Sequence, residues 1–134
     1  MKYESVQQAR EALKKLEQTQ AAYNHAMGVL YLDAATAAPS DTWEGRGKTM
    51  EVMSQITYDL LVNDENDELL SYLEAHADEL DAQTKREVEV LRKSYDQIHR
   101  IPAEEYVAYS VLINDAESVW HKAKPGYCFT ITPL

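Results

Sequence analysis

The stretch LYLDAATAAP (residues 30–39), followed by SDTWEGR (residues 40–46), decides how this chain folds. A long helical pattern leads up to Pro39, and a second helical pattern begins soon after it. Proline disfavours helical geometry at the preceding residue and has no backbone donor, so the first helix must end here. The chain must therefore turn and restart within residues 30–46, which we call the hinge.

Three polar side chains of the hinge stand beside an apolar seam. These are Asp33, Thr36 and Arg46. Polar groups that remain unpaired in such a place are costly, so we expect them to form specific hydrogen bonds. We predict that they lock the first two helices together, with contact to a substrate groove as the alternative.

The composition predicts one all-α domain. With 134 residues and 45% hydrophobic content, the chain can build one core but is too short for two domains. Glycine and proline occur only four times each. The prolines stand at the hinge or near the ends of apparent helices, as is typical of helical proteins. We predict an antiparallel bundle of about five helices with a long, coiled-coil-like first helix.

Charge and chain chemistry exclude several classes of partner. The net charge of -10, from 13 basic and 23 acidic residues, argues against binding to nucleic acid. The longest apolar run, residues 26–32, is far below the roughly 18 to 20 residues that span a membrane. Cys128 has no cysteine partner, and residues 1–4 contain no apolar signal segment. We therefore predict a cytoplasmic protein without a nucleic-acid or membrane partner.

The first two predicted helices flank the hinge. Apolar residues at alternating three- and four-residue steps follow one stripe over residues 6–30, with Gln20 as a polar interruption that sets register. Ser40 or Asp41 is the predicted cap of the second helix. The predicted buried face of that helix comprises Trp43, Met50, Met53, Ile56 or Thr57, and Leu60.

An acidic run precedes and includes the third predicted helix. Nine acidic residues and no Lys or Arg lie between Asp59 and Asp81, which indicates a solvated face. The alternative is a site for calcium or a basic partner, although the run lacks the glycine of an EF-hand loop. We predict Asp64 as the helix cap. The predicted inner face comprises Leu69, Leu70, Leu73, Ala77 and Leu80.

The last two predicted helices are separated by Pro102, which suits the first turn of the fifth helix. The fourth covers residues 81–100 and buries Val88, Leu91, Tyr95 and Ile98. The fifth runs to about residue 123. Its large side chains form one stripe: Tyr106, Tyr109, Ile113, Ala116 and Trp120, with Leu112 and Val119 beside it.

Motifs that carry chemistry are missing or incomplete. None of the four histidines is followed by glutamate, so the zinc motif H-E-x-x-H is absent. The pairs Asp96/His99 and Glu117/His121 match a di-metal bundle only partly, which leaves a metal-binding bundle as a minor alternative. There is no Gly-rich phosphate loop or G-x-S-x-G elbow. From the residues alone, we predict no catalytic, cofactor-binding or metal-binding side chain.

The hinge nevertheless resembles a known family. Asp33, Thr36 and Pro39 match the W-D-x-x-T-x-M-P segment of the thermostable metallocarboxypeptidases, the carboxypeptidase Taq family, and Arg46 falls where that family has an arginine opening its second helix. Leu32 replaces the usual tryptophan of that segment. The resemblance continues through Leu69-Leu70, Leu73, Leu80-Asp81, Tyr95, Arg100-Ile101-Pro102 and Trp120 to Lys124.

The resemblance implies an all-helical enzyme family that removes C-terminal amino acids. A divalent metal, usually zinc, with cobalt as an alternative, is held there by an H-E-x-x-H helix and a later glutamate. Residues 1–124 would then be the N-terminal portion, which packs against the substrate groove and partly covers it, without the catalytic machinery. Residues 125–134 form a divergent apolar tail, which suggests a truncated or frame-disrupted gene product.

Two functions follow as hypotheses. The first is a non-catalytic portion of a metallocarboxypeptidase, inactive by itself, with a peptide substrate and a metal only in full-length relatives. The second is a free-standing interaction module that forms a homo-oligomer. It would associate through apolar helix faces, because large exposed apolar patches drive association.

Overall fold

The computed structural model describes residues 3–123, and every regular element in that range is helical. The α-helices are α1 (Val6–Thr36), α2 (Trp43–Leu61), α3 (Asp64–Ala75), α4 (Ala82–His99) and α5 (Ala103–Ala123). Two 3-10 turns, η1 (Ser40–Thr42) and η2 (Ala77–Glu79), join them. The predicted all-α bundle with a long first helix is confirmed. The predicted tail, residues 125–134, lies outside the described residues.

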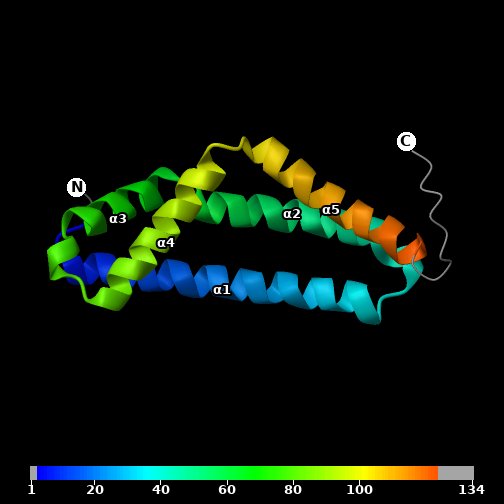
Figure 1. The fold of residues 1–134 in the computed structure, drawn as a ribbon, viewed down its shortest axis with the longest axis horizontal. Coiled ribbons are helices and arrows are strands. Elements are labelled where there is room, and N and C mark those ends of the chain that lie inside the picture. The colour runs from blue at the N-terminus through cyan, green and yellow to red at the C-terminus, as the bar shows by residue number, and fades with distance from the viewer. Residues whose placement is uncertain (1–2, 124–134) are drawn as a thin grey trace.

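The helices form an elongated bundle with two unequal ends (Figure 1). α1 runs along the whole molecule, and α2 returns antiparallel to it after the hinge. α3 and α4 pack at the end that holds the start of α1. α5 then runs back along α2 toward the hinge, and these two helices form the most extensive pair in the fold.

The hydrophobic core lies where α1, α3 and α4 meet. Leu13, Leu70 and Leu73 are at most 2% exposed, and Val88 and Leu91 of α4 join the same cluster. Burying a leucine contributes roughly 1.5 to 3 kcal/mol, so these contacts hold the three helices together. The leucines predicted for the third helix and the face predicted for the fourth are confirmed as parts of this cluster.

The apolar stripe predicted along α1 is buried over only part of its length. Ala9, Leu13 and Leu16 are buried, whereas Tyr23 and Leu30 farther along the same stripe are half-buried. The spacing is the same throughout, so the difference comes from what packs on it. α3 and α4 cover the beginning of α1, and its second half has fewer neighbours.

The helix caps differ in two places from the prediction. Asn63, and not Asp64, caps α3, because its extended backbone lets its side chain accept the Asn66 N–H at 2.8 Å. Asp64 lies inside the first turn, where its charge still favours the helix dipole. Ser40 or Asp41 was predicted to cap α2, but both lie in η1 and Thr42 stands at the N-cap position.

Arg92 of α4 forms ion pairs with acidic residues of α3. Its side chain is 17% exposed and donates to Asp67 Oδ1 at 2.6 Å, Ser71 Oγ at 2.9 Å and Glu74 Oε1 at 3.2 Å. Burial lowers the pKa of Arg92, but its bonds to the two carboxylates outweigh that effect and raise it. Part of the predicted solvated face therefore stabilises the contact between α3 and α4.

Asp81 caps α4 and makes stability depend on pH. It accepts from the Thr84 N–H and from the Thr84 hydroxyl, both at 2.9 Å, and these bonds, together with Arg10 at 2.6 Å, hold the pKa of Asp81 below its ordinary value. A lowered pKa stabilises the fold above the unfolded-state pKa of about 3.9, and this contribution is lost as the pH falls through the folded-state pKa.

We predict that Asp81→Ala lowers the melting temperature at pH 7 and that the difference from wild type shrinks below about pH 4. Asp81→Asn is the matched control, because asparagine keeps the cap acceptor without the charge. It should melt between the other two proteins at pH 7. Circular dichroism melts from pH 3 to pH 7 measure this. A loss in Asp81→Ala that stays constant over this range would contradict the prediction.

Candidate functional site

α2 and α5 meet through small and polar side chains. A Cβ atom built on Gly47 would lie 3.4 Å from Asn114 Nδ2, so the two helices are in close contact at this point. Asn114 is the buried residue of α5, and Ser54 on α2 is also buried. At the other end of the pair, the rings of Tyr58 and Tyr106 lie 5.4 Å apart.

This pairing corrects the buried face predicted for α2. The fully buried residues of α2 are Gly47, Ser54, Tyr58 and Leu61, whereas the predicted Trp43, Met50, Met53, Thr57 and Leu60 are half-buried and Ile56 is exposed. Both sets follow a helical period, and the apolar set was the obvious choice. A signal for the other set was present, because Gly47 and Ser54 are small residues seven positions apart, which permits close approach of a neighbouring helix.

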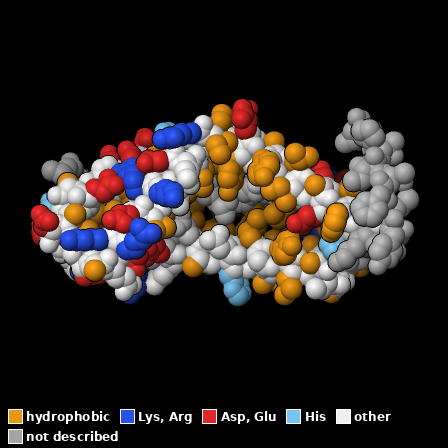
Figure 2. Space-filling view, in the orientation of Figure 1, with side chains coloured by type: hydrophobic (Ala, Val, Ile, Leu, Met, Phe, Trp, Pro, Cys, Tyr) orange, Lys and Arg blue, Asp and Glu red, His pale blue; other side chains and the backbone are white. Residues whose placement is uncertain are grey.

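Most of the large apolar side chains of α5, unlike Tyr106, are exposed to solvent. Tyr109, Leu112 and Trp120 are 63%, 62% and 66% exposed, and Ile113 and Val119 are exposed as well. Figure 2 shows hydrophobic side chains gathered over the α2–α5 end, while charged side chains gather over α3 and α4. The predicted stripe on the fifth helix thus exists, but most of it faces solvent. We call Tyr109, Leu112, Ile113, Val119 and Trp120 the α5 stripe.

The three predicted hinge residues make local contacts. The Thr36 hydroxyl donates to Leu32 O at 2.6 Å, one turn back in α1. Asp33 accepts from Ala37 N and Ala38 N through its backbone carbonyl, and its side chain is exposed. Within residues 3–123, Asp33, Thr36 and Arg46 share no hydrogen bond or ion pair. Their role as a lock between the first two helices stays a prediction.

Arg46 lies in an unusual environment. Its guanidinium carbon is 4.3 Å from the centre of the Trp43 ring, a cation–π distance, and Trp43 in turn contacts His121 of α5 at 5.6 Å between ring centres. Nη2 reaches Thr42 Oγ1 at 3.5 Å. Nη1 is buried and has no hydrogen-bond partner within residues 3–123. A buried donor without a partner is uncommon in native proteins and calls for an explanation.

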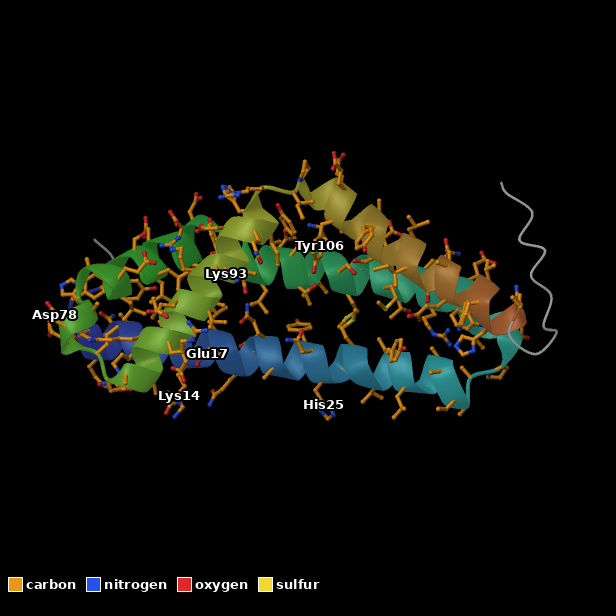
Figure 3. The ribbon with its side chains drawn as sticks, in the orientation of Figure 1. Lys14, Glu17, His25, Asp78, Lys93 and Tyr106 are labelled. Carbon is orange, nitrogen blue, oxygen red and sulfur yellow. The ribbon has the colours of Figure 1, made fainter. Side chains whose placement is uncertain are left out.

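Several hollows lie between the helices, and two of them differ clearly in lining. A cavity of about 240 Å³ at the centre of the molecule is bordered by Tyr23 of α1, Leu60 of α2 and Tyr106 of α5. A polar groove of about 860 Å³ runs between α1 and the start of α4, where Figure 3 shows Glu17. Burial there, together with the nearby charge of Glu87, raises the pKa of Glu17. Neither hollow holds a constellation of catalytic groups.

Metal-binding chemistry finds no support in residues 3–123. In that range, no three His, Cys, Asp or Glu side chains lie close enough together to share a metal ion. His25, for example, points outward from α1 (Figure 3). Within residues 3–123, neither the Asp96/His99 pair nor the Glu117/His121 pair is joined by a third side chain that could bind a metal ion. The same part of the chain contains no helix that is long and apolar enough to cross a membrane.

Comparison with known proteins gives consistent results. The family model described as Carboxypeptidase Taq (M32) metallopeptidase matches residues 12–132. Carboxypeptidase 1 of Bacillus subtilis is 31% identical over 109 residues, which cover 81% of this chain and 22% of that protein. The solved structure titled "BsuCP Crystal Structure" matches with a TM-score of 0.87 and 28% identity. The match covers 92% of this chain and 25% of that one, so this chain spans about a quarter of the relative's length.

The contacts at the hinge predict different changes in the free energy of unfolding at two positions. Asp33→Ala should change the free energy of unfolding by no more than about 0.5 kcal/mol, as is usual for exposed side chains. Arg46→Met should raise it by about 1 kcal/mol, because losing an unpartnered buried donor outweighs the lost cation–π contact. Arg46→Lys, which keeps the charge, is the control. Urea unfolding measures all three, and a loss of about 1 to 3 kcal/mol in Asp33→Ala would instead support the hinge lock.

Proposed function

Because the chain belongs to the Carboxypeptidase Taq (M32) metallopeptidase family, we propose that it is the N-terminal, non-catalytic helical portion of a zinc-dependent carboxypeptidase. The family match over residues 12–132 is the observation that carries this proposal. Carboxypeptidases of this kind release the C-terminal amino acid of a peptide. The chain spans about a quarter of its solved relative, so the reaction itself is assigned to the rest of the family fold.

Residues 3–123 do not fit the role of metal site, since they contain no cluster of three metal-binding side chains. In full-length relatives the metal, which we propose to be zinc with cobalt as an alternative, polarises a carbonyl or activates water. The portion described here would instead pack beside the substrate groove and cover part of it. The hinge side chains Asp33, Thr36 and Arg46 would face the substrate groove or lock the first two helices together. We propose that the protein is located in the cytoplasm.

A second candidate function is a self-associating helical module. The observation that favours it is the α5 stripe, in which large apolar side chains are exposed along one helix face. Exposed patches of this kind commonly mark interaction sites. A homo-oligomer formed through this face would bury side chains such as Leu112 and Trp120 against a second copy of the same chain, without a partner of different sequence.

The first proposal predicts that the purified 134-residue chain does not release C-terminal amino acids from peptides, with or without added zinc or cobalt. The reason is that the described residues do not bring metal-binding side chains together. Chromatographic detection of the freed amino acid measures this. Carboxypeptidase 1 of Bacillus subtilis is the positive control. Metal-dependent release by the 134-residue chain itself would overturn the inactive assignment.

The second candidate predicts that the apparent mass in light scattering rises with protein concentration. Leu112→Glu and Trp120→Glu should keep the chain monomeric, because each places a charge within the exposed stripe. Val90→Glu is the matched control, since Val90 is an exposed apolar residue on α4 and lies outside the stripe. A wild-type chain that stays monomeric at high concentration would rule out self-association.

A further inference from the structure

The less exposed side of α5 is mixed, with Tyr106, Val107 and Val111 beside polar residues, whereas its exposed side is rich in large apolar residues. Asn114 is 5% exposed and lies against Gly47 of α2, and the Ser110 hydroxyl is bonded to Tyr106 O in its own helix. A surface helix normally buries its apolar stripe and exposes its polar one. On α5 a second set of apolar side chains lies on the exposed side, and the contact with α2 leaves that set uncovered.

The exposed residues form one continuous surface. Tyr109, Leu112, Ile113, Val119 and Trp120 recur at helical spacing, and residues three or four apart share one face of a helix. Figure 2 shows hydrophobic side chains spread over this end of the molecule. A monomeric protein seldom exposes a patch of this kind unless something binds to it.

Among residues 3–123, the opposite end of the molecule has no comparable surface. There α3 and α4 carry ion pairs such as Arg92–Asp67 and Arg86–Glu89, and their leucines are buried in the core. Charged side chains dominate that end in Figure 2. Any partner that prefers apolar surface will therefore choose the α2–α5 end over the α3–α4 end.

The structural relative is far larger than this chain, which bears on what covers the stripe. It reproduces this fold with a TM-score of 0.87 over 92% of the chain, yet that match accounts for only 25% of its own length. The same helical arrangement is thus accompanied by a much larger body of polypeptide. Of the two ends, the apolar one is the surface onto which such a body can pack without burying unpaired charges.

We propose that the α5 stripe is the docking surface for the remaining three-quarters of the carboxypeptidase Taq fold. This inference rests on the proposed function, and it deepens it by naming the face and the partner. The partner is a complementary apolar surface of that fold, which inserts against Leu112 and Trp120. The polar Gly47–Asn114 contact keeps α5 on α2 and fixes the direction in which the stripe points.

The test is a chimera in which residues 12–123 of this chain replace the matching portion of Bacillus subtilis carboxypeptidase 1. Leu112→Glu and Trp120→Glu are introduced both into the chimera and into the 134-residue chain. We expect each to lower the chimera's melting temperature by roughly 2 °C or more, because a charge is then buried at the interface. Neither should lower that of the chain alone, where the side chains are exposed. Val90→Glu is the control in both proteins.

Each possible result of the chimera experiment supports or contradicts the proposed docking surface. A chimera that is insensitive to the stripe substitutions overturns the proposal, as does a chimera that fails to fold while the parent enzyme folds. If the same substitutions abolish self-association of the chain but leave the chimera unchanged, the occupant is a second copy, and the proposal is wrong. A stable, stripe-sensitive chimera without carboxypeptidase activity would support the docking surface and contradict the proposed function. An active, stripe-insensitive chimera would do the reverse.

Discussion

The close contact between α2 and α5 determines which surface this chain exposes. Gly47 lies close to Asn114, and a Cβ atom at position 47 would already stand in van der Waals contact with the Asn114 amide nitrogen, at 3.4 Å. Small and polar groups bring the two helices together at this point, while Tyr58 and Tyr106 pack against each other farther along the pair. Other large side chains of α5, such as Leu112 and Trp120, lie on its exposed side and set the surface chemistry of this end.

The two ends of the bundle differ in how completely their apolar side chains are buried. At the α3–α4 end, leucines such as Leu13 and Leu70 are buried, and Arg92 finds carboxylate partners. At the hinge end, the stripe of α1 is only half covered at Leu30, and α5 is apolar on its outer side. The α3–α4 end thus has the charged surface that is usual for a protein exposed to solvent, whereas the hinge end exposes large apolar side chains of the kind that are usually buried.

The sequence predicted the fold well wherever local rules decide. Helix boundaries follow from Pro39, Pro102 and the cap residues, and the face of α4 follows from its three- and four-residue spacing. The face of α2 was wrong because both candidate stripes have the helical period, and only the partner helix selects between them. The cap at Asn63 was missed for a similar reason, since Asn63 and Asp64 are both good caps and the backbone angle chooses one.

The candidate site could be named from the sequence, but its geometry could not. The family resemblance drew attention to Asp33, Thr36 and Arg46, yet the contacts they make depend on how the helices turn. Arg46 carries a buried donor without a partner, and it lies beside Trp43, which contacts α5. An unpaired buried donor and an uncovered apolar stripe are both unfavourable in a free-standing protein. Both occur along the same pair of helices, so the unfavourable features of the described residues are concentrated at the α2–α5 end.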